Sequence, residues 1–258
     1  MASKSIIFKA KNVKSFISWL KRFNSIDSSL LLEIDTNLNC FIAKINNEEK
    51  SVIKMSKINF DDAGLITTTE KSNKRIKLGI FNIVRFIKIM DQFNDAEFDL
   101  IINYEDVVGT GEEVSYTGKD ISLKNKNLKM SIDCASLNIF KYMTDNFFKS
   151  ELATIESKGE FQLPKANIEK LNQLCLLDES DHKLIEFKFL NNEILVAGKS
   201  FQLLLEEKKL KNASLKIFKD QYSNLDIENY KVNLGEDRLV FNSNDSETTT
   251  VISMAIDE

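Results

Sequence analysis

The sequence predicts an α+β protein made of two similar domains, each with antiparallel sheets and two helices. Three observations lead to this prediction: many short runs typical of strands, only four segments with helical periodicity, and an order of elements that repeats after about half of the 258 residues. At this length each of two domains can bury a core of its own. A parallel βαβ fold is not favoured, because long series of strands have no helix between them.

Ten short runs rich in apolar and β-branched residues are predicted to be strands. The chain has one proline and eight glycines, so Asn, Asp and Ser are expected to make most of the turns between them. The predicted strands cover residues 5–10, 30–34, 40–45, 52–58, 98–104, 128–134, 184–189, 201–205, 230–234 and 250–256.

Four segments have apolar residues at helical spacing. The first, residues 11–24, is the clearest, and one of its faces is expected to pack while the other is purely basic. The second covers residues 81–93. The third begins at Pro164, a residue favoured in the first helical turn, and a weaker fourth covers residues 214–223.

The second and fourth helices resemble each other in sequence. Residues 89–94 align with residues 218–223 at an offset of 129, and a strand led by an aromatic residue follows each helix. This repeated order indicates an internal duplication. The expected domains are residues 1–134 and 151–258, joined by a connector at 135–150.

No catalytic or metal-binding signature is present. The single histidine, His182, lies in an acidic segment and is expected to be a solvated loop residue. The adjacent carboxylates Asp61 and Asp62, like Glu112 and Glu113, are more commonly solvated than metal-binding, and no P-loop, GxGxxG or EF-hand motif occurs. We therefore predict a protein that is not an enzyme and has no cofactor. Carboxylates brought together by the fold are the alternative that one sequence leaves open.

Three widely separated cysteines, none in a CxxC arrangement, indicate reduced core thiols rather than disulfides or a zinc site. No apolar run approaches the roughly 18 residues of a membrane-spanning helix. The N-terminus lacks the features of a secretion signal. We expect an intracellular protein with no membrane partner.

Charge is distributed unevenly along the chain. The formal net charge is −4, which by itself gives no sign of nucleic-acid binding. The four predicted helices nevertheless hold ten basic and three acidic residues, a net charge of +7 that leaves −11 for the remainder. Basic helices on one side of the sheets would form a surface for a polyanion, whereas the alternative is that the lysines only keep the helices soluble. The ten basic residues are Lys11, Lys14, Lys21, Arg22, Arg85, Lys88, Lys165, Lys170, Lys216 and Lys219.

Several stretches of the chain resemble one known family. The sequence FNIVRFIKIM, followed by NDAEF, and the C-terminal half are similar to the DNA polymerase sliding clamps of T4-type bacteriophages, which have a PCNA-like fold. The similarity runs in order over most of the chain, through hydrophobic patterns and a few identities. The stretches are residues 81–90, 94–98, 217–225, 228–232 and 251–256.

The resemblance implies a homotrimeric ring whose helices line a central hole around double-stranded DNA. It implies contacts to phosphates without sequence specificity, made by the ten basic residues and largely mediated by water. It also implies that an ATP-dependent clamp loader opens the ring, that DNA polymerase is tethered, and that partner peptides bind near the connector. Late transcription factors are further partners of such clamps, and the location would be the cytoplasm of an infected bacterium. The chain is somewhat long for the family, and we expect the additional residues in a loop at 105–120 and at 134–151.

By position in the clamp topology, the resemblance places the subunit contacts on two edge strands, residues 126–134 and 201–207. Pairing between subunits would cover edges that are otherwise prone to aggregation. The alternative is that both strands pair within the subunit. The expected interface residues are Lys126, Leu128, Met130, Ile132, Phe201, Leu203 and Leu205.

Two other functions stay open from the sequence. A monomeric processivity factor of the same fold would hold DNA on one open basic face. A β-rich viral structural or assembly protein would need the helix lysines for solubility alone. The oligomeric state is the observation that best separates these functions.

Overall fold

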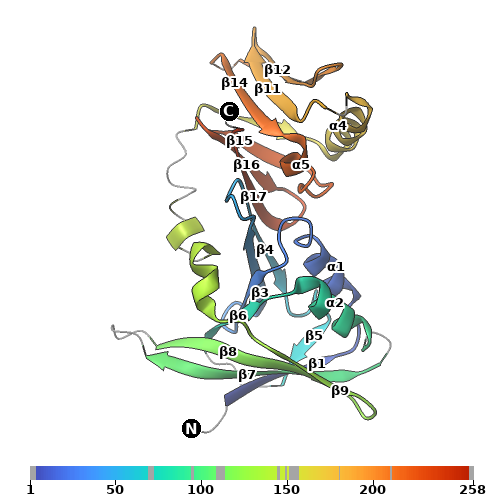
Figure 1. Cartoon of the computed structure of the whole chain (residues 1–258), viewed down its shortest axis with the longest axis vertical. Helices are drawn as coiled ribbons and strands as arrows, with labels where there is room; N and C mark the ends of the chain where they lie inside the picture. Colours follow the sequence, from blue (N-terminus) through green and yellow to red (C-terminus); the bar gives the residue numbers. More distant parts are fainter. Residues whose placement is uncertain are drawn as a thin grey trace. The chain divides into compact units, whose positions relative to one another are not determined.

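The chain folds into two compact units in a computed structural model (Figure 1). Unit 1 consists of Met1–Ile45 and Met55–Thr144, and unit 2 consists of Asn46–Lys54 and Asp145–Glu258. The short segment of unit 2 that precedes Met55 was not predicted from the sequence. The structure describes residues 4–68, 73–93, 96–108, 114–143, 146–148, 150, 157–179, 181–209 and 211–255.

Unit 1 is built on a sheet in which neighbouring strands follow the order β4, β3, β2, β6, β8, β7, β1, β5, with β9 paired to β8. Its pairings are antiparallel except for a short parallel contact between β6 and β8. The strands are β1 (Lys4–Ala10), β2 (Leu30–Asp35), β3 (Cys40–Asn46), β4 (Val52–Asn59), β5 (Leu65–Thr67), β6 (Arg75–Ile80), β7 (Phe98–Val108), β8 (Val114–Lys124) and β9 (Lys129–Asp133).

Helices α1 (Lys14–Lys21) and α2 (Ile83–Asp91) lie side by side on one face of this sheet (Figure 1). The two helices bury the same positions when they are aligned at an offset of 70 residues; Phe16 and Phe86, for example, are both buried. The side chain of Asn82 caps α2 by accepting the N–H of Arg85 at 2.8 Å. Unit 1 therefore presents two equivalent helix faces to solvent.

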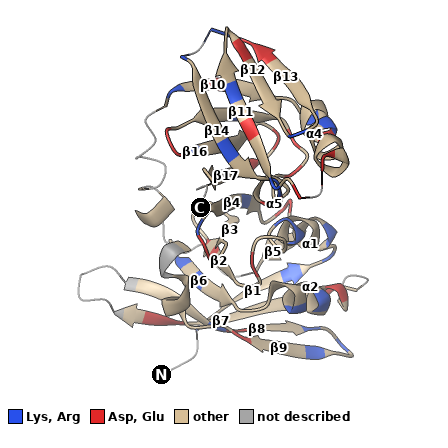
Figure 2. Ribbon diagram, turned by 45° about the horizontal axis from the view of Figure 1, so that its top comes forward, with Lys and Arg blue, Asp and Glu red and all other residues tan. Residues whose placement is uncertain are grey.

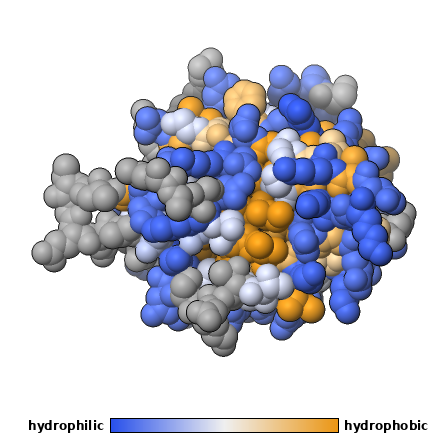
Figure 3. Space-filling view, turned by 90° about the horizontal axis from the view of Figure 1, so that it is seen from below, coloured by the Kyte–Doolittle hydropathy of each residue, from blue (hydrophilic) through white to orange (hydrophobic). Residues whose placement is uncertain are grey.

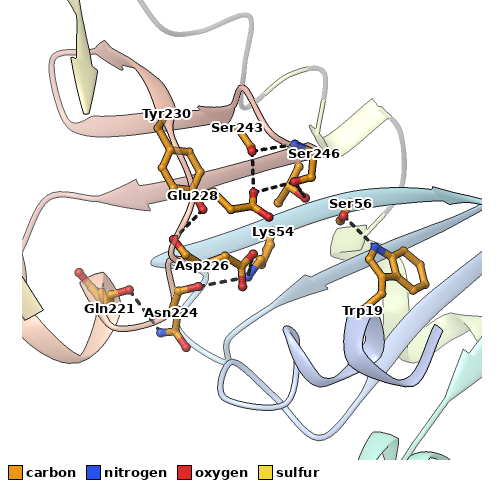
Figure 4. Close-up of polar contacts among 11 residues, drawn as sticks. Trp19, Lys54, Ser56, Gln221, Asn224, Asp226, Glu228, Tyr230, Ser243 and Ser246 are labelled. Carbon is orange, nitrogen blue, oxygen red and sulfur yellow. Dashed lines mark hydrogen bonds and ion pairs between the residues drawn. The ribbon is translucent and has the colours of Figure 1, made fainter. Parts of the chain in front are cut away.

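Aromatic rings join α1 to the sheet beneath it. The ring of Phe41 lies 4.9 Å from that of Phe16 and 5.5 Å from that of Phe8, centroid to centroid. Trp19 stacks on Phe16, and its indole Nε1–H donates to the hydroxyl of Ser56 at 2.9 Å (Figure 4). Because a buried indole N–H needs an acceptor, this bond fixes the side of α1 that faces the core.

The opposite face of the sheet carries a buried ion cluster. Lys44 and Glu33 are fully buried, with Nζ 2.7 Å from Oε1, and the guanidinium of Arg75 lies 2.6 Å from Oε2 of Glu33. Nearby, Phe140 of the 3₁₀ segment η1 (Leu137–Met143) packs so closely on Gly79 that an added Cβ would meet its ring at 2.5 Å. Part of the predicted connector thus packs on unit 1.

Farther along the same face, towards β1 and β7, the surface is mostly polar. The strand register places Ile7 opposite Ile101, and polar residues such as Ser5 and Asn103 follow on either strand. Figure 3 shows a largely hydrophilic surface with an apolar patch near its centre and scattered apolar residues around it. The alternation of apolar and polar residues is typical of an antiparallel sheet with one solvated face.

Unit 2 packs two sheets around a second core. Strands β13, β12, β11 and β14 form one sheet, and β10, β15, β16 and β17 are neighbours in the other. The N–H of Ser253 bonds the carbonyl of Ser51 at 2.8 Å and so attaches the segment Asn46–Lys54 to this unit. The elements are β10 (Gly159–Leu163), α4 (Lys165–Leu177), β11 (Leu184–Leu190), β12 (Glu193–Ala197), β13 (Gln202–Glu207), β14 (Ala213–Phe218), α5 (Lys219–Tyr222), β15 (Tyr230–Leu234), β16 (Arg238–Ser243) and β17 (Glu247–Ser253).

Buried polar groups connect the loops of unit 2. The ammonium of Lys54, fully buried, lies 2.8 Å from the carboxylate of Asp226 (Figure 4). Glu228 accepts hydrogen bonds from the hydroxyls of Ser243 and Ser246 at 2.5 and 2.7 Å. These bonds satisfy charges that would otherwise be costly to bury.

Two predictions about elements are wrong. The fourth helix was expected over residues 214–223, but only Lys219–Tyr222 is helical and the preceding residues form strand β14. The expected loop at 105–120 is largely a long hairpin of β7 and β8, with residues 109–113 outside the described part of the chain. The partner of β14 is β11, which is distant in sequence. The partner of β7 is β8, a strand that was not predicted.

Candidate nucleic-acid interface

The solvent face of α1 and α2 carries four basic side chains, which Figure 2 shows as blue segments on both helices. Lys14, Lys21, Arg85 and Lys88 are all exposed, and none has an ion-pair partner among the residues that the structure describes. The reason is periodicity: the apolar positions of each helix point to the core, so the positions between them point to solvent. Four cations are therefore available to an external anion.

Two further predicted residues flank α1 and are less available. The ammonium of Lys11, just before the helix, lies 3.9 Å from a carboxylate oxygen of Glu97. Arg22 follows the last residue of α1 and is half-buried. Both lie beside the four central cations in unit 1, but their contacts within the protein reduce what they offer to a ligand.

Helix α4 of unit 2 carries the next two predicted residues. Lys165 lies 4.0 Å from Glu169 one turn later, whereas exposed Lys170 has no ion-pair partner among the described residues. Such an exposed i, i+4 pair is weak and breaks readily in favour of a phosphate.

The last two predicted residues do not belong to a basic helix face. Lys216 lies in β14, where it stands opposite Glu186 of β11 on the sheet face away from the core. Lys219 begins α5, but its ammonium lies 2.8 Å from the buried carboxylate of Asp178 and its side chain is only 16% exposed. The prediction that Lys216 lies in a helix is wrong, because it pairs across strands in β14. Lys219 is helical as predicted, but its ammonium is held in a buried ion pair with Asp178.

With the boundaries of the structure, the four helices α1, α2, α4 and α5 hold seven basic and three acidic residues, a net charge of +4 rather than the expected +7. The difference comes from Lys216, now in a strand, and from Lys11 and Arg22, which adjoin α1. Most of this positive charge lies on α1 and α2.

The carboxylate of Asp178 is held by hydrogen bonds within the protein and is not available to a ligand. Burial alone would raise the pKa of this carboxyl, but hydrogen bonds from Lys219, from the hydroxyl and N–H of Ser200 and from the N–H of Lys199 hold its pKa well below the ordinary value. The carboxylate thereby ties the end of α4 to the turn before β13. Gly198 completes this arrangement, because a Cβ there would lie 2.5 Å from an Asp178 oxygen.

The remaining candidates from the sequence lie apart from the basic face. Asp61 and Asp62 are exposed in a turn, His182 is a half-buried loop residue, and Glu112 and Glu113 lie outside the described residues. The described residues contain no group of three or more side chains suited to a metal ion, and none of their helices is long and apolar enough to span a membrane.

The cysteines are free thiols. Burial raises the pKa of Cys134 to about 12 and that of Cys175 to about 11, so both are protonated at neutral pH.

Both strands expected at a subunit interface are edge strands. Within the described residues β9 pairs along its length only with β8, and β13 only with β12. Their side chains differ in use: Leu203 is buried in the unit 2 core, with Phe201 and Leu205 packed against it, and Met130 and Ile132 pack against the unit 1 core. Only Lys126 and Leu128 of the predicted set are exposed. Both strands are therefore available to a partner mainly through the backbone N–H and C=O groups of their outer edge.

Sequence reasoning missed two exposed leucines. Leu176 and Leu177, at the end of α4, are 87% and 81% exposed. They follow Leu174 and Cys175 directly, so they do not lie on the apolar face formed by Ile168 and Leu171. The helical period could have revealed that both leucines point away from this face.

The arrangement can bind a polyanion without reading its sequence. Long, flexible lysine chains on a helix surface can follow phosphates but form no fork that fits one base. One aromatic side chain, Phe81, is exposed at the start of α2, 67% by area. The described residues thus provide positive charge rather than a set of stacking platforms.

No family model and no curated protein matches the sequence. Solved structures do match. The proliferating cell nuclear antigen (PCNA) of Entamoeba histolytica has a TM-score of 0.63 at 14% identity, over 97% of this chain and 99% of that one. The PCNA of A. fulgidus, bound to the C-terminal region of FEN-1, has a TM-score of 0.64 at 9% identity, over 98% and 99%.

Bacterial β subunits of DNA polymerase III are also similar. The β chain of Streptococcus pneumoniae has a TM-score of 0.67 at 13% identity, and the present chain spans 66% of its length. For the Eubacterium rectale protein the TM-score is 0.65, the identity 11% and the share 65%. At such identities the likeness establishes the fold alone, and this 258-residue chain has the two-domain α+β fold of a PCNA-type sliding-clamp subunit.

Proposed function

We propose that this protein is a DNA sliding clamp, which encircles duplex DNA and tethers the replicative DNA polymerase. The observation that carries the proposal is the face of α1 and α2, where Lys14, Lys21, Arg85 and Lys88 are exposed and have no carboxylate partner in the described part of the chain. Although the protein has a net charge of −4, this face is suited to a phosphate backbone.

The mechanism follows from the weakness of each contact. A lysine ammonium in water gains little from a single phosphate, and the contact exchanges rapidly with water and counterions. Several such contacts hold the duplex near the helix face but fix no register along it. A protein held by topology and guided by such contacts can slide, whereas bidentate base contacts would stop it.

The wider proposal concerns assembly and partners. We propose a homotrimer joined through the β9 and β13 edges, opened by an ATP-dependent clamp loader, non-enzymatic, and acting in the cytoplasm of a bacterium infected by a T4-type phage. Late transcription factors are further proposed partners. The near-complete coverage of both PCNA chains supports a two-domain subunit, and neighbouring structures include a Helicobacter pylori β clamp bound to a DNA ligase peptide.

The proposal is tested by measuring mass in solution and loader-dependent polymerase processivity on a primed circle. The variant Lys14→Glu, Lys21→Glu, Arg85→Glu, Lys88→Glu should keep its fold and lose most of the gain in processivity. Unaltered processivity would show that these four side chains do not form the DNA-binding surface. A strict monomer that holds closed circular DNA without a loader would instead establish the monomeric processivity factor.

A further inference from the structure

A row of charged side chains crosses four strands of unit 1 on the sheet face opposite α1 and α2. The strand register places Lys9 of β1 beside Asp99 of β7, Asp99 beside Lys124 of β8, and Lys124 beside Lys129 of β9. Their neighbours in sequence, such as Phe98, are buried in the core beneath the helices, so the row faces the other way. Figure 2 shows basic residues on β9. Three of the four side chains in this row are cations.

Two lysines of this row stand directly opposite each other. Lys124 and Lys129 are both exposed, and neither has an ion-pair partner among the described residues. Like charges directly opposite on neighbouring strands destabilise a sheet. Because an external anion would relieve this repulsion, this end of the sheet favours an anionic ligand.

An open pocket of about 380 Å³ lies at the same end of the sheet, between β1, the start of β7 and the β8–β9 turn. Four lysines and two carboxylates line it, which gives its wall a net charge of +2. The six charged residues of the wall are Lys9, Lys11, Lys124, Lys126, Glu97 and Asp99.

The two carboxylates of the pocket bind their lysines weakly. The ammonium of Lys9 lies 3.6 Å from an oxygen of Asp99, and that of Lys11 lies 3.9 Å from an oxygen of Glu97. Both distances exceed the about 2.7–2.9 Å of a charge-assisted hydrogen bond. All four side chains are at least 40% exposed, so each pair contributes little stability. An anionic ligand can therefore replace these contacts at little cost.

The backbone around the pocket is held by local contacts. The side chain of Asn125 closes the β8–β9 turn, because it accepts the N–H groups of Asn127 at 2.9 Å and Leu128 at 2.8 Å. On the other wall, the ring of Phe98 packs on that of Phe93, 5.2 Å between centroids. A ligand would thus have to order lysine side chains but no backbone segment.

The composition of the wall favours a peptide over a nucleic acid. Phe98, the one aromatic residue among the described residues of the wall, is buried, so it offers no ring on which a base can stack. Glu97 and Asp99 would repel a continuous phosphate backbone, but they can accept hydrogen bonds from the N–H groups of a peptide. Lys9 and Lys124 lie two strands apart, about 10 Å, which is also the span of about three residues in an extended peptide.

From these observations we infer that the pocket between β1, β7 and the β8–β9 turn binds a carboxylate-rich segment of a partner protein, with Lys9 and Lys124 as the main contacts. The inference goes beyond the proposed function, which assigns double-stranded DNA to the exposed face of α1 and α2 on the opposite side of the sheet. It also requires no pairing of strand edges between subunits. One unit would then hold two different anionic ligands on two separate faces.

The test is fluorescence anisotropy of a short labelled peptide of alternating aspartate and serine at low salt. Lys9→Glu with Lys124→Glu should weaken peptide binding about tenfold or more. Lys9→Arg with Lys124→Arg, which keeps the charge, should bind the peptide within a few-fold of the original chain. The control Lys183→Glu with Lys209→Glu makes the same charge change at two exposed lysines of unit 2 and should leave peptide binding unchanged.

Two further measurements establish which ligand the pocket takes. A peptide with asparagine in place of aspartate should not bind the original chain. Duplex binding should be retained by the Lys9→Glu, Lys124→Glu variant, because neither residue belongs to the exposed face of α1 and α2. Circular dichroism and the fluorescence of Trp19 verify that each variant is folded.

The inference would be overturned if the original chain did not bind the acidic peptide, or if the Lys9→Glu, Lys124→Glu variant bound it equally well. An equal loss in the unit 2 control would show that net charge alone governs binding, which also overturns it. So would a labelled oligothymidylate that binds in place of the peptide and is lost in the same variant. None of these results depends on duplex binding by α1 and α2, so the clamp proposal is tested separately.

Discussion

Replacing Lys14, Lys21 and Lys88 by glutamine should lower duplex affinity and, more diagnostically, its salt dependence. Because the three ammonium groups have no protein partner among the described residues, their loss should change the free energy of unfolding by no more than about 0.5 kcal/mol. Each phosphate contact contributes about 0.9 to the slope of log affinity against log salt, so up to about 2.7 should be lost. At 0.1 M salt this corresponds to a loss of affinity of at most about 500-fold.

The assay is fluorescence anisotropy of a short labelled duplex over a salt series. The matched control replaces Lys183, Lys209 and Lys211 by glutamine; these lysines are also exposed, lie outside helices, and change the net charge equally. If the control lowers the slope as much as the test variant, general charge rather than the helix face governs binding. An unchanged slope for the test variant would refute the proposed contacts.

Three further predictions concern stability. Because the folded pKa of Asp178 lies below its unfolded value of about 3.9, its contribution is complete above that pH and is lost as pH falls below it; Asp178→Asn should flatten the acid limb of a stability profile, and an unchanged limb would contradict this. Gly198→Ala should destabilise by about 1–3 kcal/mol in denaturant titrations, since its Cβ would overlap the Asp178 carboxylate; a neutral effect would show that the turn yields. Lys44→Met leaves Glu33 buried with Arg75 alone and should lower the free energy of unfolding by about 3–5 kcal/mol in the same titrations. An unchanged free energy of unfolding would show that the Lys44–Glu33 pair is not needed for stability.

The helices of unit 1 could be predicted from the sequence because their periodicity is strong and local. The spacing of Phe16 and Leu20 in α1, and of Phe86 and Met90 in α2, requires one buried face, and both pairs are buried. Lysines between the apolar positions must then be exposed wherever the helix lies on the surface. This local logic predicted the central part of the basic face.

The fourth helix failed because its sequence fits two periods. Leu215 and Phe218 have helical spacing, yet Leu215 and Ile217 also alternate with polar Ser214 and Lys216, as a strand requires. Pairing with β11, distant in sequence, decides for the strand. No window of sequence contains that partner.

The sequence by itself determined the fold class, the cation-rich helix faces of unit 1 and, through the resemblance, the proposal of a clamp. These depend on residues a few positions apart, whose relation is set by the helix or strand period. Only the tertiary structure decided which charges remain available: it pairs Lys219 with Asp178, leaves Lys14 and Lys88 without an ion-pair partner among the described residues, and sets Glu193 opposite Glu207. Ion pairs and strand edges are made by residues far apart in the chain, and their energies depend on burial and distance, which no local pattern encodes.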